Sequence, residues 1–362
     1  MKKIVISGYY GFDNLGDEAI LAAVVQSLRE LEENFSIVVL SNQPQVTAER
    51  YQVEAINRFN FKTIIKTIKK ADIFISGGGS LLQDVTSWRT IPYYLGLVWL
   101  AQFFQRKTVF YAQGVGPINS TLNRKLVKWV GNRTDQITVR DRDSAQLLHD
   151  IGIDPGLVSV TVDPVFAFNP EQLNQNISDK LSDELNDLLA TDEKLIGVSV
   201  RPWKDNSYLE SMARGADLAA DLTGGRVVFV PMHQGKDVEV SRKVQEMMDH
   251  DSTLLADNYT PTEMLEVYNN FDLFLGVRLH SLIFAAVNRV PFIGISYDPK
   301  VDSLMSALEM ESGLTTDNCP YPALKKNIYQ TWQNYDEIKQ NLDQRVNKLY
   351  QKARDNVKQI SN

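Results

Sequence analysis

The sequence predicts an α/β protein built from two doubly wound, parallel-sheet domains. Short apolar runs typical of buried strands alternate with helical patterns along most of the chain. Glycines or polar residues follow many of these runs, as expected at the carboxyl edge of a parallel sheet. The 362 residues, of which 43% are hydrophobic, are also enough to form two hydrophobic cores.

The first half of the chain contains six strand-like runs separated by helical segments. The first run, MKKIVIS, leads into the loop GYYGFDNLGD, whose glycines match neither the dinucleotide-binding nor the Walker A spacing. Asp13, Asn14 and Asp17 suit sugar hydroxyls or proton transfer better than phosphate, although Asp17 could simply favour a helix N-terminus. Other small or polar residues after strands of this half are Gly77, Gly78, Gly79, Gln113, Gly114 and Arg140. The glycines allow a ligand or another chain segment to approach the backbone closely.

The second half contains a strand–turn–helix–strand unit over residues 271–298, FDLFLGVRLHSLIFAAVNRVPFIGISYD. Its turn places Arg278 and His280 at the carboxyl end of a strand, where backbone N–H groups also favour anions. We therefore expect a phosphate or carboxylate site there. The alternative is an arginine paired with a carboxylate and a histidine that caps the helix. Arg201 and Lys300 follow other strands of this half and would add positive charge.

These patterns predict the domain boundaries. We expect an N-terminal Rossmann-like domain at residues 1–169, a polar, acidic connection at 170–190 and a C-terminal Rossmann-like domain at 191–326. Apolar residues at three- and four-residue intervals predict an amphipathic helix over 327–362. Two such domains facing a central cleft, with the terminal helix crossing back to the first, have the layout of GT-B glycosyltransferases. Fold alone does not define the reaction.

Composition argues against several classes of protein. The net charge of −7 is unlike that of a dedicated nucleic-acid binder. With one cysteine and no histidine spacing typical of zinc sites, we expect no internal disulfide and no metal. No segment has the roughly 18 consecutive apolar residues of a membrane-spanning helix, and the N-terminus lacks a signal peptide, so we expect a cytoplasmic protein.

Two helical segments in the N-terminal half are basic. Residues 62–70 and 124–133 combine Lys and Arg with apolar residues, within a chain of negative net charge. By pattern each is an ordinary surface helix that packs on the sheet.

Six motifs occur in the order GYYGFDNLGDEAIL, ISGGGSLLQD, YAQGVGP, TVRDRDS, SVRPW and GVRLHSLIFAA. In this combination the chain resembles the polysaccharide pyruvyl transferase family, and most closely its bacterial cell-wall branch, over nearly its whole length. The resemblance implies transfer of a pyruvyl group from phosphoenolpyruvate to a sugar, with formation of a pyruvate ketal and release of phosphate. It also implies phosphoenolpyruvate as a co-substrate, no cofactor, and an acceptor sugar carried on a polyprenyl diphosphate. A lipid-linked acceptor raises the alternative that the two basic helices make a peripheral contact with anionic lipid headgroups at the inner face of the cell membrane.

The resemblance and the residue chemistry together suggest roles for the site residues. His280 would protonate the methylene carbon of phosphoenolpyruvate, and Asp13 or Asp17 would accept the proton of the attacking hydroxyl. Arg278 would act both in catalysis and in donor binding, whereas His233 could bind the donor or merely cap a turn. The expected donor-binding residues are Arg201, Arg278, His280, Ser281, Lys300 and His233. The expected acceptor-binding residues are Asp13, Asn14, Asp17, Gly78, Gly79, Gln113 and Arg140.

Two other functions are open on the same fold. A nucleotide-sugar glycosyltransferase would need an acidic group for a ribose and a pocket for a base, and the sequence shows no clear glutamate pair with the corresponding spacing. A carbohydrate-binding or scaffold protein of the wall pathway would need no catalytic group.

Overall fold

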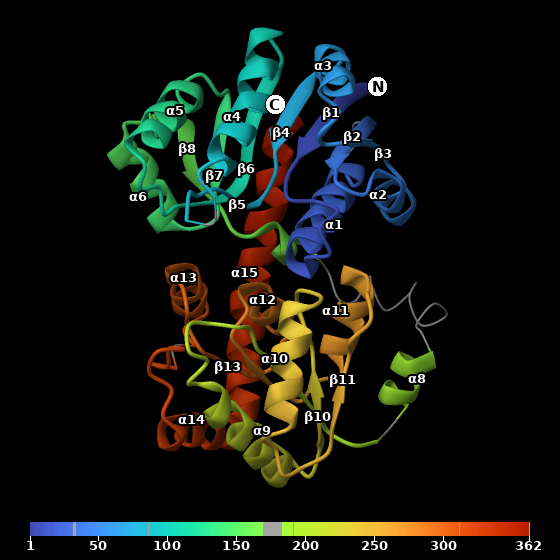
Figure 1. Cartoon of the computed structure of the whole chain (residues 1–362), viewed down its shortest axis with the longest axis vertical. Coiled ribbons are helices and arrows are strands. Elements are labelled where there is room, and N and C mark those ends of the chain that lie inside the picture. Colours follow the sequence, from blue (N-terminus) through green and yellow to red (C-terminus); the bar gives the residue numbers. More distant parts are fainter. Residues whose placement is uncertain (32–33, 86, 169–182, 191, 311, 362) are drawn as a thin grey trace. The chain divides into compact units, whose positions relative to one another are not determined.

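A computed structural model of the chain has two parallel β-sheets with helices between most successive strands, which confirms the predicted α/β class (Figure 1). It describes residues 1–31, 34–85, 87–168, 183–190, 192–310 and 312–361. The chain forms two compact units, each with its own sheet. Unit 1 comprises Met1–Ala167 and Leu349–Asn362, and unit 2 comprises Phe168–Lys348.

Unit 1 contains an eight-stranded sheet in the order β3-β2-β1-β4-β6-β7-β8, with β5 paired to β6. All of these pairs are parallel. Apolar runs such as IVI in β1 and IFI in β4 form buried strands because both faces of a parallel sheet are covered. The strands are β1 (Lys2–Ser7), β2 (Phe35–Ser41), β3 (Glu54–Asn57), β4 (Ile73–Ser76), β5 (Gly79–Leu82), β6 (Lys107–Val115), β7 (Gln136–Val139) and β8 (Val158–Val160).

The helices of unit 1 connect these strands and cover the sheet. They are α1 (Leu15–Arg29), α2 (Pro44–Tyr51), α3 (Phe61–Lys69), α4 (Thr90–Phe103), α5 (Thr121–Gly131) and α6 (Arg142–Ile151), with the 3₁₀ turns η1 (Pro155–Leu157) and η2 (Pro164–Ala167). One hydrophobic cluster joins the strand residues Phe74 and Phe110 to Ile68 on α3, Val98 on α4 and Val127 on α5. Burial of these side chains stabilises the layered arrangement.

Unit 2 contains a five-stranded parallel sheet in the order β11-β10-β9-β12-β13. Its strands are β9 (Leu195–Ser199), β10 (Arg226–Phe229), β11 (Ser252–Leu254), β12 (Leu273–Gly276) and β13 (Phe292–Gly294). Its helices are α8 (Asp183–Leu189), α9 (Leu209–Thr223), α10 (Lys236–Gln245), α11 (Pro261–Asn269), α12 (Leu279–Val287), α13 (Pro299–Leu308), α14 (Tyr321–Gln333) and α15 (Tyr335–Ser361). The strand residues Val198 and Leu275 share a core with Met212 on α9 and Ile328 on α14.

Both sheets have a topological switch point at an inner strand. In unit 1 the chain passes from β1 outward to β2 and β3, and then returns to the other side of β1 with β4 (Figure 1). In unit 2 it passes from β9 to β10 and β11, and returns with β12. Ligands of open α/β sheets bind outside the carboxyl ends of the strands at such a point. The candidate sites are therefore the segments that follow β1 and β4, and those that follow β9 and β12.

The structure differs from the predicted elements in two respects. β3 and β5 are absent from the predicted strands because β3 is a short edge strand of mixed polarity, EAIN, and β5 begins inside the glycine run. The single helix predicted from residue 327 is instead two helices, α14 and α15, separated at Asn334. Most of the predicted connection at 170–190 lies outside the described residues, and α8 occupies part of its end.

The terminal helix α15 contributes residues to both units. In unit 2, Arg289 Nε donates a hydrogen bond to Asp343 Oδ1 at 3.0 Å. In unit 1, Lys107 Nζ donates to the carbonyl oxygen of Ile360 at 3.0 Å. The part from Leu349 onward belongs to unit 1, in agreement with the predicted return of this helix to the first domain.

Candidate functional site

Two arginines leave neighbouring strands at the switch point of unit 2. Ser199, the last residue of β9, pairs with Gly276, the last residue of β12. Arg201 and Arg278 each follow two residues later, so they start from the same edge of the sheet. This places both predicted cations where an α/β sheet binds ligands.

Arg278 forms a partly buried ion pair with Asp237, so the pairing of this arginine with a carboxylate, which the sequence left open as an alternative, is present. Its Nε donates to Asp237 Oδ2 at 2.9 Å, and its Nη2 contacts Asp237 Oδ1. Asp237 lies in the first turn of α10, is fully buried, and also accepts a hydrogen bond from the backbone N–H of His233 at 3.1 Å. Because a guanidinium has five N–H donors, this pair still leaves donors for an anionic ligand.

Arg201 contacts two aromatic rings that also pack on each other. Its guanidinium carbon is 4.0 Å from the ring centroid of Tyr297 and 5.0 Å from that of Trp203. Burial lowers the pKa of Arg201 below its ordinary value; Tyr297 opposes that shift and the nearby Arg278 charge adds to it. An anion bound here would favour the charged guanidinium and offset the cost of burial.

Lys300 contacts the same Tyr297 ring as Arg201. Its Nζ lies 5.4 Å from the centroid of Tyr297 and 3.3 Å from Asp298 Oδ2. Lys300 is in the first turn of α13, whose N-cap is Asp298. Tyr297 therefore brings two cations to one aromatic surface at the end of β13, in the cation–π range.

The remaining predicted donor residues have defined local contacts. His280 lies in the first turn of α12 and is partly buried. Ser281 is fully buried, and its Oγ donates to the carbonyl oxygen of Arg278 at 2.6 Å. The His233 ring Nδ1 lies 2.6 Å from the carbonyl oxygen of Gln234, which fits the alternative that His233 caps a turn.

The glycines that follow β4 in unit 1 lie close to side chains of neighbouring segments, with no open space where a Cβ atom would stand. A Cβ atom at Gly77 would lie 2.3 Å from the hydroxyl of Tyr10, which is fully buried. At Gly78 it would lie 2.9 Å from Ile20, and at Gly79 2.9 Å from Asp17. Of the two alternatives stated for this run, close approach of another chain segment is the one that these contacts show.

Gln113 and Arg140 also have partners within unit 1. Gln113 is fully buried, and its Nε2 donates to Ser76 Oγ at 2.7 Å. Arg140 Nη1 donates to Asp163 Oδ2 at 3.2 Å, and its Nη2 donates to Ser80 Oγ at 3.1 Å. Through these contacts both side chains connect segments at the carboxyl ends of neighbouring strands, independently of any ligand.

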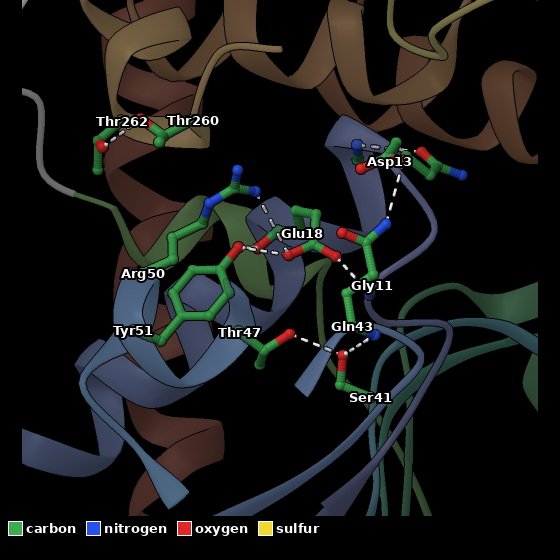
Figure 2. Close-up of polar contacts among 12 residues, drawn as sticks. Gly11, Asp13, Glu18, Ser41, Gln43, Thr47, Arg50, Tyr51, Thr260 and Thr262 are labelled. Carbon is green, nitrogen blue, oxygen red and sulfur yellow. Dashed lines mark hydrogen bonds and ion pairs between the residues drawn. The ribbon is translucent and has the colours of Figure 1, made fainter. Parts of the chain in front are cut away.

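The loop after β1 is held by a buried carboxylate. Glu18 Oε1 accepts the backbone N–H of Gly11 at 2.8 Å, and its Oε2 accepts the hydroxyl of Tyr51 at 2.6 Å (Figure 2). Asp13 is exposed, has a positive φ of 54°, and its Oδ2 accepts Gln43 Nε2 at 3.3 Å. Asn14 caps α1 through the N–H of Gly16. Asp13 is thus presented on a loop whose backbone is fixed.

The structure therefore brings the predicted cations together but changes what surrounds them. Asp237, Tyr297 and Trp203 complete the cationic edge of unit 2, and Glu18 fixes the loop of unit 1. The sequence offered one usable signal, because Trp203 and Tyr297 follow strand ends just as Arg201 and Arg278 do. Glu18 carried no signal beyond its place near a helix N-terminus.

Arg278→Ala is expected to lower the free energy of unfolding by about 3–5 kcal/mol, because it leaves the buried Asp237 carboxylate without its guanidinium. Urea unfolding followed by circular dichroism measures the change. Lys204→Ala, which breaks an exposed ion pair with Asp317, is the control and should cost less than about 1 kcal/mol. The double variant Arg278→Ala/Asp237→Asn should recover part of the loss. Equal stability of Arg278→Ala and Lys204→Ala would contradict this account.

Solved structures share this fold at low sequence identity. The UDP-GlcNAc 2-epimerase of Neisseria meningitidis, bound to UDP-GlcNAc, has a TM-score of 0.70 and 12% identity, covering 100% of this chain and 99% of that chain. A glycosyltransferase of Rickettsia africae has a TM-score of 0.67 and 13% identity, covering 99% and 98%. Anabaena HepE in complex with UDP-glucose has a TM-score of 0.64 and 11% identity, covering 100% and 98%. These similarities show the GT-B fold and no more.

No curated protein matches the chain in sequence. A family model described as polysaccharide pyruvyl transferase matches residues 14–299, which is most of the chain. The matched range contains Arg201, Arg278 and His280, begins after Asp13 and ends before Lys300. The chain therefore belongs to the polysaccharide pyruvyl transferase family.

Proposed function

We propose that this enzyme transfers a pyruvyl group from phosphoenolpyruvate to a lipid-linked sugar of a cell-wall polysaccharide precursor, forming a pyruvate ketal and releasing phosphate. The observation that supports this most is the cationic edge of unit 2, where Arg201 and Arg278 leave adjacent strands. Lys300 adds a third cation beside Arg201 on the ring of Tyr297.

The charge of this edge suits phosphoenolpyruvate. The donor has both a phosphate and a carboxylate, and each needs fixed positive charge and N–H donors. Asp237 neutralises part of the Arg278 charge and Asp298 part of the Lys300 charge, whereas Arg201 contacts aromatic rings and is the less compensated cation. We propose that Arg201, Arg278 and Lys300 hold the two anionic groups, with Ser281 and His233 at the margin of the site.

The reaction needs an acid, and we propose His280. Protonation of the donor's methylene carbon turns it into a methyl group and makes the central carbon electrophilic. One sugar hydroxyl then adds to that carbon and loses its proton to a base. The carbon–oxygen bond to phosphate breaks, phosphate leaves with the electron pair, and a second hydroxyl of the sugar closes the ketal. The proton of the second hydroxyl replaces the one that His280 gave.

The acceptor side of the proposal uses the loop after β1. Asp13 is our candidate for the base, with Asp17 as the alternative, because Asp13 is an exposed carboxylate on a loop fixed by Glu18. Asn14 would orient the sugar. The proposed contacts from Gly78, Gly79, Gln113 and Arg140 would have to be made beside the internal partners that these residues already have.

Phosphate release from phosphoenolpyruvate, measured with a panel of lipid-linked disaccharides, tests this function directly. Release that depends on both the donor and an acceptor is the expected result. Thermal melting with phosphoenolpyruvate, UDP-sugars or sugar alone distinguishes the alternatives, because a bound ligand raises the melting temperature. Stabilisation by UDP-sugars alone would favour a nucleotide-sugar glycosyltransferase instead.

Arg201→Ala should weaken phosphoenolpyruvate binding at least about tenfold, because it removes a charge-assisted contact worth about 1.5–3 kcal/mol. Isothermal titration calorimetry measures the dissociation constant. Lys204→Ala, three residues further along the same loop, removes an exposed cation paired with Asp317 and should leave binding unchanged. If Arg201→Ala bound the donor as tightly as wild type, Arg201 would have no part in the donor site.

His280→Gln should lower the turnover number by about 10²–10⁴, while the dissociation constant of the donor stays within about threefold. The reason is that a general acid acts in the transition state, whereas the cations also bind the ground state. His250→Gln is the control, because His250 is exposed and contacts Asp217 and Asp221. Turnover near that of wild type for His280→Gln would show that His280 is only a structural residue of α12.

We also propose a peripheral contact with anionic membranes through α3 and α5. Among the described residues no helix is long and apolar enough to cross a bilayer. In α3 the apolar residues Ile64 and Ile68 are buried, while the lysines are exposed. The exposed lysines of the two helices include Lys66, Lys69, Lys70, Lys125 and Lys128. Each cation near an anionic surface contributes about 1 kcal/mol of attraction.

Changing these five lysines to Glu should abolish co-sedimentation with vesicles that contain phosphatidylglycerol. Arg124 is left in place because its Nε donates to the carbonyl oxygen of Ile118. A control with the same change of charge replaces five exposed lysines of unit 2 by Glu: Lys243, Lys325, Lys326, Lys339 and Lys348. Equal binding by the two variants, or none by wild type, would contradict the proposed contact.

A further inference from the structure

An aromatic surface lies at the carboxyl edge of the unit 1 sheet, among residues to which no role has been assigned above. Tyr9 and Phe12 follow β1, and Phe59 follows β3. Tyr9 is 39% exposed, Phe59 is 56% exposed and Phe12 is half-buried. The Tyr9 and Phe12 rings are stacked, with centroids 4.2 Å apart and planes inclined by 10°.

Arg58 contacts this surface from its buried side. Its guanidinium carbon lies 5.0 Å from the ring centroid of Phe12 and 5.6 Å from that of Phe59. Its Nη1 donates to the carbonyl oxygen of Gly8 at 2.8 Å. Arg58 therefore connects the segment after β1 to the segment after β3 and fixes the aromatic rings relative to each other.

A second layer of aromatic residues encloses the same guanidinium. Arg58 Nη2 donates to the hydroxyl of Tyr94 at 3.1 Å, and the ring centroid of Tyr93 is 4.8 Å away. The hydroxyl of Tyr93 donates back to the carbonyl oxygen of Arg58 at 2.8 Å. Arg58 is 5% exposed, and its Nε has no hydrogen-bond partner within the described chain.

In this cluster the charged side chain is buried and two of the aromatic rings are exposed, which is the opposite of an ordinary core. A typical core covers the aromatic rings and leaves the charged side chain in water, since burying a charge is costly. Here the cation is inside, while Tyr9 and Phe59 remain in contact with water. The arrangement stabilises exposed rings in one geometry, which is the requirement of a surface that stacks on a ligand.

We propose that Tyr9, Phe12 and Phe59 form a stacking platform for the pyranose ring of the acceptor. This inference rests on the proposed function, in which a sugar is the acceptor. The C–H face of a pyranose is apolar and packs on aromatic rings, while the hydroxyls at its edge need hydrogen-bonding groups. Asp13, next to Phe12, offers a carboxylate to such a hydroxyl. The acidic side chains of this loop disfavour an anionic ligand at the same place.

The test uses Tyr9→Ala and Phe59→Ala, two exposed positions whose change should not prevent folding. Each variant should raise the KM for a lipid-linked disaccharide acceptor about tenfold in phosphoenolpyruvate-dependent phosphate release. The dissociation constant of the donor should not change, and Phe59→Trp should keep the wild-type KM because it keeps an aromatic face. Phe103→Ala, which removes a 66% exposed phenylalanine from α4, is the matched control.

Saturation-transfer NMR with the methyl β-glycosides of glucose, galactose, N-acetylglucosamine and N-acetylmannosamine separates this inference from the proposed function. If wild type is active and both alanine variants keep its acceptor KM, the platform is wrong and the function stands. If wild type releases no phosphate but binds a glycoside that both variants lose, the platform stands without pyruvyl transfer. If wild type neither releases phosphate nor binds any glycoside, the platform proposal is overturned. It is also overturned if the rings bind adenosine and none of the glycosides.

Discussion

The ion pair between Arg278 and Asp237 is the interaction on which the cationic edge of unit 2 depends. In this sheet β9 lies between β10 and β12, so the pair connects a segment after β10 to one after β12, on either side of the strand that leads to Arg201. Asp237 is fully buried and raises the pKa of Arg201, against the lowering by burial and by Arg278. One carboxylate thus stabilises two cations that would otherwise repel each other. Asp237 therefore both stabilises the fold and holds the two guanidinium groups at this edge.

The strands of both sheets could be predicted because parallel strands are buried on both faces, which gives continuous apolar runs such as those of β4 and β12. The apolar periodicity wrongly predicted one continuous helix where the structure has α14 and α15. The pattern continues across the break between α14 and α15, because Trp332 and Tyr335 keep the spacing of one helix, with ring centroids 5.3 Å apart. No glycine or proline follows Asn334, and the signals that do mark the break, Asn334 itself and the acidic Asp336 and Glu337 after it, are weaker than the continuous apolar spacing.

Sequence reasoning could place Arg201 and Arg278 at one edge of the sheet, but it could not identify the residues that contact them. Arg201 and Arg278 were predictable because the carboxyl ends of parallel strands meet at one edge. Asp237 was not, since it lies 41 residues from Arg278 and only the folded chain brings them together. The same limit applies to Gly79 and Arg140. A glycine indicates that something approaches the backbone, and an arginine indicates an anion, but neither identifies the group as Asp17 or Asp163.

The two sheet edges differ in what they leave available to a ligand. At the carboxyl edge of unit 1, Arg58 is buried and Arg140 partly buried, both with partners from the chain, and the exposed groups around the loop after β1 include aromatic rings and the carboxylate of Asp13. Such a surface suits a neutral molecule with an apolar face and hydroxyls. At the carboxyl edge of unit 2, Arg201, Arg278 and Lys300 lie with two carboxylates, Asp237 and Asp298, and the remaining positive charge suits a small anionic molecule. The proposed reaction joins an anionic donor to a neutral sugar, and we propose from this difference in charge that the donor binds at the edge of unit 2 and the acceptor at the edge of unit 1.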